Sequence, residues 1–125
     1  MPLSVDSRRA GDLVILTCRG RLVEGAESSM LQKYLDEAIA RCPRVVLHMG
    51  GVDFMDSSGL GLLARYLIRV RNAHGNLKLC AVSAKFDEVL RTTKLRSIFE
   101  TYASEADAIA AFDQPAAAPS TPRGL

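Results

Sequence analysis

The stretch that decides how this chain is interpreted reads Phe54-Met55-Asp56-Ser57-Ser58-Gly59-Leu60-Gly61. Before it, Val45-Val46-Leu47 form a short apolar block rich in β-branched residues, which predicts a strand. After it, apolar residues recur at three- and four-residue spacing, which predicts a helix: Leu60, Leu63, Tyr66, Leu67 and Val70. Three side chains that carry oxygen, those of Asp56, Ser57 and Ser58, therefore lie in a turn between a strand and a helix.

An ordinary helix cap explains part of this pattern. Asp and Ser are favoured at a helix N-cap because their side-chain oxygens accept hydrogen bonds from first-turn N–H groups that lack a partner in the helix. Such a cap accounts for one or two of the three residues. A helix N-terminus also favours negative charge, so a serine there can be phosphorylated without loss of the fold. The same phosphate would disturb a binding surface shaped for a neutral hydroxyl.

The segment resembles the signature of the STAS domain, in the branch of bacterial anti-sigma factor antagonists. The resemblance covers residues 3–112. Gly20 closes a strand, the Gly75 turn leads into the apolar run at 77–82, and residues 95–99 precede a final Ala-rich helix. A STAS domain implies an α/β fold, with a four- or five-stranded mixed sheet and about four helices.

The pattern of apolar residues also predicts alternating strands and helices. Strands are expected at 5–8, 13–18, 44–49, 77–82 and, at the sheet edge, 96–101. Helices are expected at 25–41, 58–73, 85–92 and 105–112. The strand at 44–49 is apolar without alternation, so we expect it to be central and covered on both faces. Gly20 is expected to end the second strand.

Single residues indicate how these helices begin, end and pack. Ser83 and Ser104 are expected N-caps, and Gly75 is expected to take the left-handed conformation that follows a helix. The helix at 85–92 is expected to face inward with Phe86, Val89 and Leu90. The arginines of the long helix are interpreted as a solvated face; they are Arg65, Arg69 and Arg71.

Length and composition fit one domain. A chain of 125 residues can bury one core but is too short for two ordinary domains. We expect the STAS domain at residues 1–113 and a disordered tail at 114–125, which is rich in Pro and Ala. A net charge of +2 is too small to indicate a nucleic acid or an anionic membrane as partner.

Cysteine usage and the N-terminus indicate a cytoplasmic protein. Cys18, Cys42 and Cys80 are odd in number and lie in apolar sequence, so we expect buried free thiols rather than disulfides. The first residues lack the basic and apolar regions of a signal peptide. Since no apolar run is long enough to cross a bilayer, no membrane insertion is expected.

Catalytic interpretations have weaker support. The segment from Gly59 to Ala64 satisfies the dinucleotide-binding pattern G-x-G-x-x-A, but its glycines do not directly follow a strand and no acid ends the next strand. Ser57 lacks the nucleophile elbow of a hydrolase. His48 and His74, without paired cysteines or clustered carboxylates, do not indicate a metal site. We therefore expect a binding module rather than an enzyme, with no cofactor and no metal.

The resemblance implies a phosphorylation switch. In the family, the serine directly after the Asp is the phosphoacceptor, which here is Ser57, and Ser58 is then the expected structural cap. The unmodified protein would bind an anti-sigma factor that is also a serine/threonine kinase, and phosphorylation would release it and so regulate sigma-factor-dependent transcription. A serine phosphatase would reset the switch. The implied partner-binding residues are Asp56, Ser57, Ser58, Gly59, Leu60, Gly61 and Glu24.

One position departs from the family pattern. Family members often read Gly-x-Leu-Asp after the second strand, whereas this chain reads Gly20-Arg21-Leu22-Val23-Glu24. The acid is displaced by one position, and Glu24 is the candidate substitute. The alternative is a non-switching STAS adaptor subunit in another complex, such as a lipid-trafficking or stress-signalling assembly.

The displaced acid gives a first prediction. If Glu24 replaces the family's Asp, Glu24→Ala should weaken binding of the kinase partner, or phosphorylation by it, while the fold remains intact. Val23→Asp should be neutral or should improve binding. Affinities of both variants for the partner, measured by calorimetry, test this expectation. Wild-type behaviour of both would place the 20–24 loop outside the interface.

Overall fold

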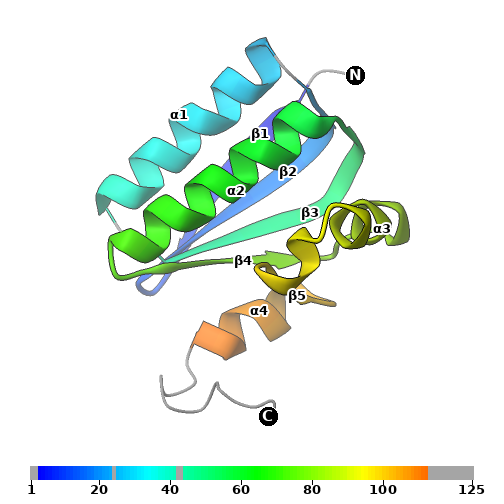
Figure 1. Cartoon of the computed structure of the whole chain (residues 1–125). Coiled ribbons are helices and arrows are strands. Elements are labelled where there is room, and N and C mark those ends of the chain that lie inside the picture. Colours follow the sequence, from blue (N-terminus) through cyan, green and yellow to red (C-terminus); the bar gives the residue numbers. More distant parts are fainter. Residues whose placement is uncertain (1–2, 24, 42–43, 113–125) are drawn as a thin grey trace.

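Residues 3–23, 25–41 and 44–112 are described by a computed structural model, which shows a mixed sheet with helices on both faces (Figure 1). The strands are β1 (Ser4–Ala10), β2 (Leu13–Leu22), β3 (Arg44–Met55), β4 (Asn76–Cys80) and β5 (Glu100–Tyr102). The helices are α1 (Ala26–Arg41), α2 (Ser57–Asn72), α3 (Ala84–Thr92) and α4 (Glu105–Phe112), with a 3-10 turn η1 at Leu95–Ser97.

The five strands lie in sequence order across the sheet, β1-β2-β3-β4-β5. β1 pairs with β2 as an antiparallel hairpin, and Gly11 between them has φ +64°, which suits glycine. The pairs β2 with β3, β3 with β4 and β4 with β5 are parallel, and each is connected through a helix. The expected α/β class, with a four- or five-stranded mixed sheet and about four helices, is confirmed, and the sheet has five strands.

Two apolar cores lie on opposite faces of the sheet. Helices α1 and α2 lie side by side over one face, and α4 lies on the other (Figure 1). On β3, Leu47 belongs to the larger core and its neighbour Val46 to the smaller core under α4, because successive side chains of a strand point to opposite faces. Both are fully buried, so the prediction of a central strand covered on both faces is confirmed.

Several strand ends differ from the expectation, and the edge strand expected at 96–101 is only β5 (Glu100–Tyr102), because Leu95–Ser97 form the turn η1. The prediction that Gly20 ends the second strand is wrong, since β2 continues to Leu22. Gly20 has φ +101°, and the pairing register with β3 shifts directly after it. A glycine inside a strand thus marks an irregularity in the ladder instead of its end. β3 likewise runs on to Met55, six residues beyond the expected strand, and its extension pairs with β2.

The helix ends are partly as expected. The Ser83 side chain accepts a hydrogen bond from Phe86 N at 3.1 Å and the Ser104 side chain accepts one from Asp107 N at 3.1 Å, which confirms both caps. The prediction for Gly75 is wrong, because His74 takes the left-handed conformation, with φ +66°. The N–H of Gly75 instead donates to Val70 O at 2.9 Å and closes the end of α2.

The described cysteines agree with the sequence. Cys18 and Cys80 are free and buried. Burial raises the pKa of Cys18 to about 12, and burial together with the charge of Glu105 raises that of Cys80 to about 11. Both thiols therefore stay protonated and unreactive near neutral pH. Cys42 and the predicted tail at 114–125 lie outside the described residues.

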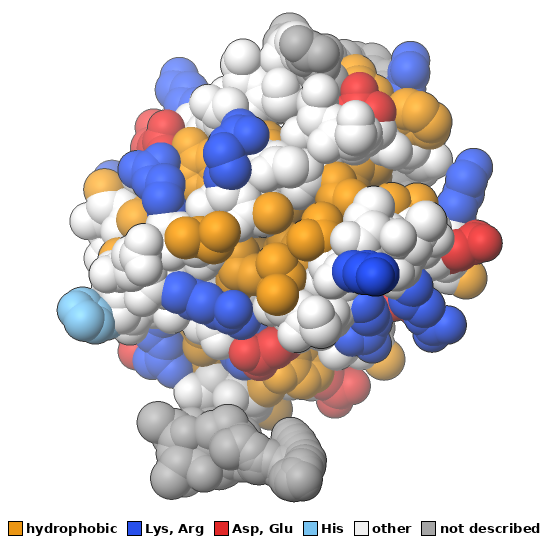
Figure 2. All heavy atoms as spheres, in the orientation of Figure 1, with side chains coloured by type: hydrophobic (Ala, Val, Ile, Leu, Met, Phe, Trp, Pro, Cys, Tyr) orange, Lys and Arg blue, Asp and Glu red, His pale blue; other side chains and the backbone are white. Residues whose placement is uncertain are grey.

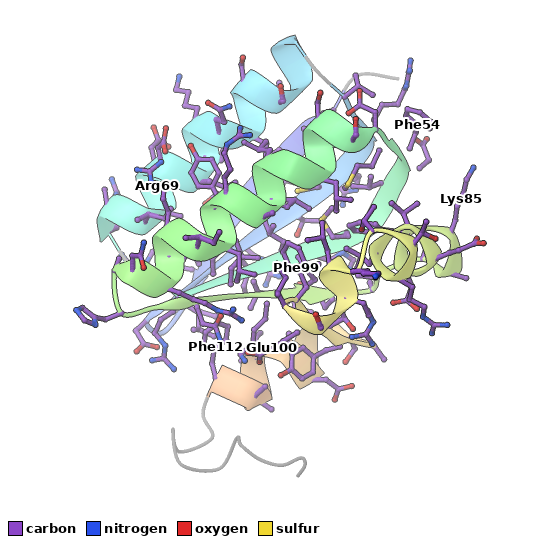
Figure 3. The ribbon with its side chains drawn as sticks, viewed as in Figure 1. Phe54, Arg69, Lys85, Phe99, Glu100 and Phe112 are labelled. Atoms are coloured by element: carbon purple, nitrogen blue, oxygen red, sulfur yellow. The ribbon has the colours of Figure 1, made fainter. Side chains whose placement is uncertain are left out.

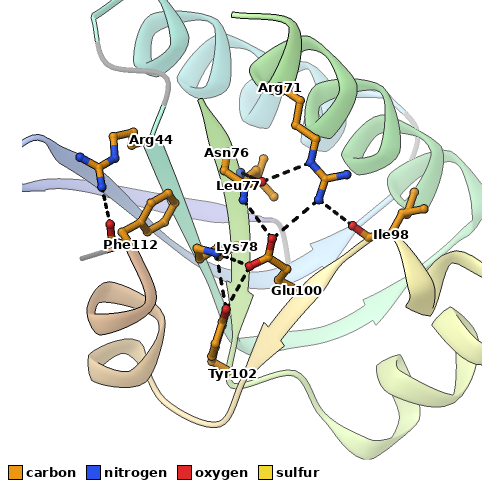
Figure 4. Close-up of polar contacts among 9 residues, drawn as sticks. All are labelled: Arg44, Arg71, Asn76, Leu77, Lys78, Ile98, Glu100, Tyr102 and Phe112. Atoms are coloured by element: carbon orange, nitrogen blue, oxygen red, sulfur yellow. Dashed lines mark hydrogen bonds and ion pairs between the residues drawn. The ribbon is translucent and has the colours of Figure 1, made fainter. Parts of the chain in front are cut away.

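A polar cluster joins β4, β5 and the end of α2 (Figure 4). The Lys78 side chain is 7% exposed, and its ammonium group donates to Glu100. The same carboxylate accepts hydrogen bonds from Asn76 Nδ2 and Tyr102 OH, each at 3.0 Å. Burial alone would raise the pKa of Glu100, but these donors and the charge of Lys78 outweigh it and lower that pKa. Arg71 of α2 donates to Ile98 O at 3.0 Å.

This cluster gives a second prediction. Glu100→Gln should lower the free energy of unfolding at pH 7 by about 2 kcal/mol, since it leaves the Lys78 ammonium buried without a carboxylate, and the exposed part of Glu100 keeps the loss below that of a fully buried pair. The folded-state pKa of Glu100 lies below its usual 4.5, so its stabilisation is complete above that pH and disappears as the pH falls through the lowered value.

Urea denaturation at pH 7 and at pH 3 measures both effects. The double variant Lys78→Met with Glu100→Gln is the matched control and should recover part of the loss, because no charge is then left unpaired. A single variant as stable as the wild type at pH 7 would show that the pair contributes nothing.

Candidate functional site

The turn before α2 is built on Asp56. This residue is the N-cap of α2, with an extended backbone, and its Oδ1 accepts a hydrogen bond from Gly59 N at 3.0 Å. Its own N–H donates to Leu22 O at 3.3 Å, so the turn is also attached to the end of β2. The expectation that Ser58 is the cap is wrong. The helix begins one residue earlier, at Ser57, and Ser58 lies in its first turn.

Gly59 brings the start of α2 directly against the end of β2. A Cβ at position 59 would lie 2.7 Å from Leu22 O, 2.8 Å from Leu22 Cγ and 3.0 Å from Met55 Cγ. Distances this short force the helix away from the strand, and the nearest atom is backbone, which cannot move aside cheaply. Glycine at this position is therefore needed for the close approach of the two elements.

The structure brings most of the expected partner-binding residues into one turn. Ser57 is exposed, and Asp56, Ser58 and Gly61 are half-buried. Gly59 and Leu60 are buried, so they hold the turn in place from below. The seventh expected residue, Glu24, lies outside the described residues.

Ser57 lines an open hollow of about 360 Å³ between α1 and α2. The described residues around it are Ser28, Gln32, Ser57, Ser58, Gly61, Leu62 and Arg65. Polar side chains and a glycine form most of this lining, and none of these residues is acidic. The hollow thus offers hydrogen-bond donors next to the exposed serine.

A polar contact holds α1 against α2 beside this hollow. Asp36 of α1 accepts hydrogen bonds from Tyr66 OH at 2.6 Å and from Arg69 Nη1 at 2.8 Å, both on α2. The bond from Tyr66, helped by Arg69, lowers the pKa of Asp36 despite its partial burial. Burial and the Asp36 carboxylate raise the pKa of Tyr66. The expected solvated face agrees with the structure, since Arg65, Arg69 and Arg71 are all exposed. Arg69 and Arg71 also make structural contacts, with Asp36 and with Ile98 O.

Comparisons with known proteins agree with this architecture. The sequence model of the STAS domain matches residues 4–108. The chain belongs to the STAS domain family. The anti-sigma F factor antagonist of Paenibacillus polymyxa is 31% identical to it over 112 residues, which are 87% of this chain and 94% of that protein. The expected resemblance to the anti-sigma factor antagonist branch is confirmed.

Solved structures show the same fold at lower identity. An anti-sigma factor antagonist from Mycobacterium paratuberculosis superposes with a TM-score of 0.80 at 18% identity, covering 90% of this chain and 95% of that one. The anti-sigma factor antagonist SpoIIAA in its unphosphorylated form gives 0.70 at 18% identity and coverages of 90% and 100%. Bacillus SpoIIAA in its phosphorylated form gives 0.71 at 19% identity and coverages of 87% and 99%.

Next to the turn at Asp56 and Ser57, this STAS domain has an apolar groove that the sequence did not reveal. Phe54 is 45% exposed and Val89 is 37% exposed, so the expectation that Val89 faces inward is wrong. Both line a groove of about 70 Å³ between the end of β3 and α3. Phe54 and Lys85 point outward on the same side of the molecule (Figure 3), and the Arg21 guanidinium lies 5.4 Å from the Phe54 ring centroid.

More apolar surface lies on the same face of the molecule. Figure 2 shows a hydrophobic area in its middle, bordered by Lys and Arg side chains. Ile68 of α2 is 58% exposed on its helix. Exposed apolar groups of this kind are typical of protein interfaces. Sequence patterns could not show the exposure of Phe54, because it depends on β3 running past the end of its pairing with β4 at His48.

Two findings concern other kinds of site. Among residues 3–23, 25–41 and 44–112, no three His, Cys, Asp or Glu side chains come together where they could hold a metal ion. Within the same described residues, no helix combines the length and the apolar character needed to cross a membrane.

The cap gives a third prediction. Asp56→Ala should lower the free energy of unfolding by about 1 kcal/mol, because Gly59 N loses its acceptor, whereas Asp56→Asn should cost less since Asn caps helices as well as Asp does. Ser58→Ala is the matched comparison and should cost less than Asp56→Ala. Chemical denaturation of the three variants decides between the two caps. A larger loss for Ser58→Ala would overturn the assignment of Asp56.

Proposed function

We propose that this STAS domain is an anti-sigma factor antagonist whose binding to an anti-sigma factor is switched by phosphorylation of Ser57. The observation that carries the proposal is the position of Ser57: it is exposed and opens α2, while Asp56 supplies the cap. Its hydroxyl is therefore not the group that caps the helix. The relative from Paenibacillus polymyxa, named an anti-sigma F factor antagonist, supports the same role.

The fold tolerates a phosphate on Ser57. The first turn of α2 presents backbone N–H groups and the positive end of the helix dipole, which favour an anion by about 0.3 to 1 kcal/mol at an exposed position. No acidic residue lies in the first turn of α2. The domain can thus change its charge without unfolding, which a reversible switch requires. SpoIIAA, a protein of similar fold, has been solved in both phosphorylated and unphosphorylated forms, which agrees with the expectation that a STAS domain can be phosphorylated and stay folded.

Phosphorylation of Ser57 should weaken partner binding, although the fold tolerates it. Phosphorylation adds between one and two negative charges next to an apolar groove that contains Phe54 and Val89. A partner that packs on this groove would have to remove water from the phosphate, at a cost of several kcal/mol. Since 1.4 kcal/mol corresponds to a tenfold change in affinity, the loss amounts to at least about a hundredfold.

A cycle of binding, phosphorylation, release and dephosphorylation requires two partners, a kinase and a phosphatase. An anti-sigma factor with serine/threonine kinase activity binds the unmodified domain, gives up its sigma factor, and phosphorylates Ser57 with ATP. The phosphorylated domain dissociates, and a serine phosphatase restores the hydroxyl. Transcription that depends on the sigma factor is thereby regulated, and the domain itself acts in the cytoplasm as a substrate and binding module rather than as a catalyst.

One observation favours the second candidate, a non-switching STAS adaptor in another complex. Val23 stands where family members often carry an Asp, and Val23 is half-buried, with no charge to offer a kinase. The adaptor would use the same surface without phosphorylation.

Phosphorylation by the cognate kinase gives a fourth prediction. After incubation with the partner and ATP, phosphopeptide mass spectrometry should find the phosphate on Ser57 in the wild type and in Ser58→Ala. Ser57→Ala should not be phosphorylated but should still bind the partner, because the hydroxyl contributes about one hydrogen bond, worth 0.5 to 1.5 kcal/mol. Ser57→Asp should weaken binding, although one carboxylate carries less charge than a phosphate.

Two results would speak against the proposal. Modification at Ser58 would move the switch by one residue. Binding of an active kinase that modifies neither serine would favour the non-switching adaptor.

A further inference from the structure

Arg65 differs from most arginines of the domain in having no hydrogen-bond or ion-pair partner among the described residues. The arginines that do form ion pairs are Arg8, Arg19, Arg44, Arg69, Arg71, Arg91 and Arg96. On α2 itself, Arg69 is held by Asp36 and Arg71 by the β5 side of the sheet. Arg65 is exposed and lines the hollow that also contains Ser57. Its guanidinium is therefore available to a group placed in that hollow.

Ser57, Gly61 and Arg65 form one row along α2. Residues four apart on a helix are surface neighbours, so Gly61 lies between the serine and the arginine. Long helical side chains lean toward the N-terminus of their helix. Arg65 follows this rule, because its Nη1 lies 4.0 Å from the position that a Cβ on Gly61 would occupy. The guanidinium therefore lies at the level of Gly61, which is one helical turn from Ser57.

A phosphate on Ser57 can span the remaining distance between the serine and the guanidinium. Four helical residues rise by about 6 Å, which is the distance left between the level of Gly61 and that of Ser57. A phosphoryl group extends a few ångströms beyond the serine oxygen, and a charge-assisted hydrogen bond from guanidinium to phosphate adds about 2.8 Å. Because Gly61 has no side chain, the path between the two groups is open.

We propose that Arg65 binds the phosphate of phosphorylated Ser57 across Gly61, within the hollow between α1 and α2. This proposal rests on the proposed function, since it concerns the modified form of the same serine. Gln32 of α1 lines the hollow as well and provides a second, neutral donor. The Ser28 hydroxyl, in contrast, donates to Gly25 O at 3.1 Å.

Two consequences follow for the switch. In the unmodified form, the exposed guanidinium of Arg65 is part of the surface offered to a partner. In the phosphorylated form, the Arg65 guanidinium binds the phosphate. The partner then no longer contacts the arginine cation, and the phosphate adds negative charge to the same surface. Arg65 is then a specificity-determining residue that increases the difference between the two forms, and not a catalytic residue.

A titration of the phosphate tests the contact. Phosphoserine is installed at position 57 during protein synthesis, and the second pKa of the phosphate is measured by ³¹P NMR in the full chain. A guanidinium in contact stabilises the dianion and lowers this pKa, which is about 6 for a free phosphoserine. We expect the pKa in Arg65→Gln to lie about half a pH unit above that of wild-type Arg65. Gly61→Leu should raise the pKa similarly, because its side chain fills the path.

Arg9→Gln is the matched control, since Arg9 is an exposed arginine on β1 and its loss changes the net charge equally. It should leave the phosphate pKa unchanged. Equal pKa values in wild type and Arg65→Gln, or equal shifts in Arg9→Gln and Arg65→Gln, would overturn the proposal. The titration needs no kinase. A kinase that ignores Ser57 would therefore contradict the proposed function alone.

Discussion

The contact between the start of α2 and the end of β2 is the constraint on which the site depends. Gly59 leaves no room for a side chain above Leu22 O, and the N–H of Asp56 donates to that same oxygen. Asp56 in turn caps the helix through Gly59 N. Two adjacent elements are thus held at backbone distance, and Ser57 is left at the surface. Any larger residue at position 59 would move the helix and with it the serine.

The buried core and the polar cluster at Lys78 are separate from the surface around Ser57. The sheet is buried on both faces at β3, and the cluster of Lys78, Glu100 and Tyr102 ties its far edge to the rest. Neither feature involves Ser57. The phosphate proposed for Ser57 would therefore act on the surface around α1 and α2 without reaching the core. This separation is what a reversible protein switch needs.

The sequence predicted the parts that depend on local chemistry. The spacing of apolar residues located α2, and the side chains of Ser83 and Ser104 located two helix caps. The central position of β3 followed from its unbroken apolar block. For the site, the stretch from Asp56 to Gly61 located the turn correctly, since it joins a strand pattern to a helix pattern.

Features set by tertiary contacts could not be predicted. Three neighbouring residues, Asp56, Ser57 and Ser58, can each cap a helix, and only the packing on β2 selects the first. Glycine suggested a strand end at Gly20 and a left-handed cap at Gly75, but pairing with β3 extends β2, and His74 takes the cap conformation. The apolar groove at Phe54 likewise depends on how the end of β3 meets α3, which no local pattern encodes.

The proposed switch at Ser57 is tested most directly by the affinity of the anti-sigma partner for two forms of this chain, measured by isothermal titration calorimetry. One form carries phosphoserine at position 57 and the other is unmodified. We expect the partner to bind the unmodified chain and to bind the phosphorylated chain at least about a hundredfold more weakly, although both are folded. Equal affinities of the two forms would contradict it.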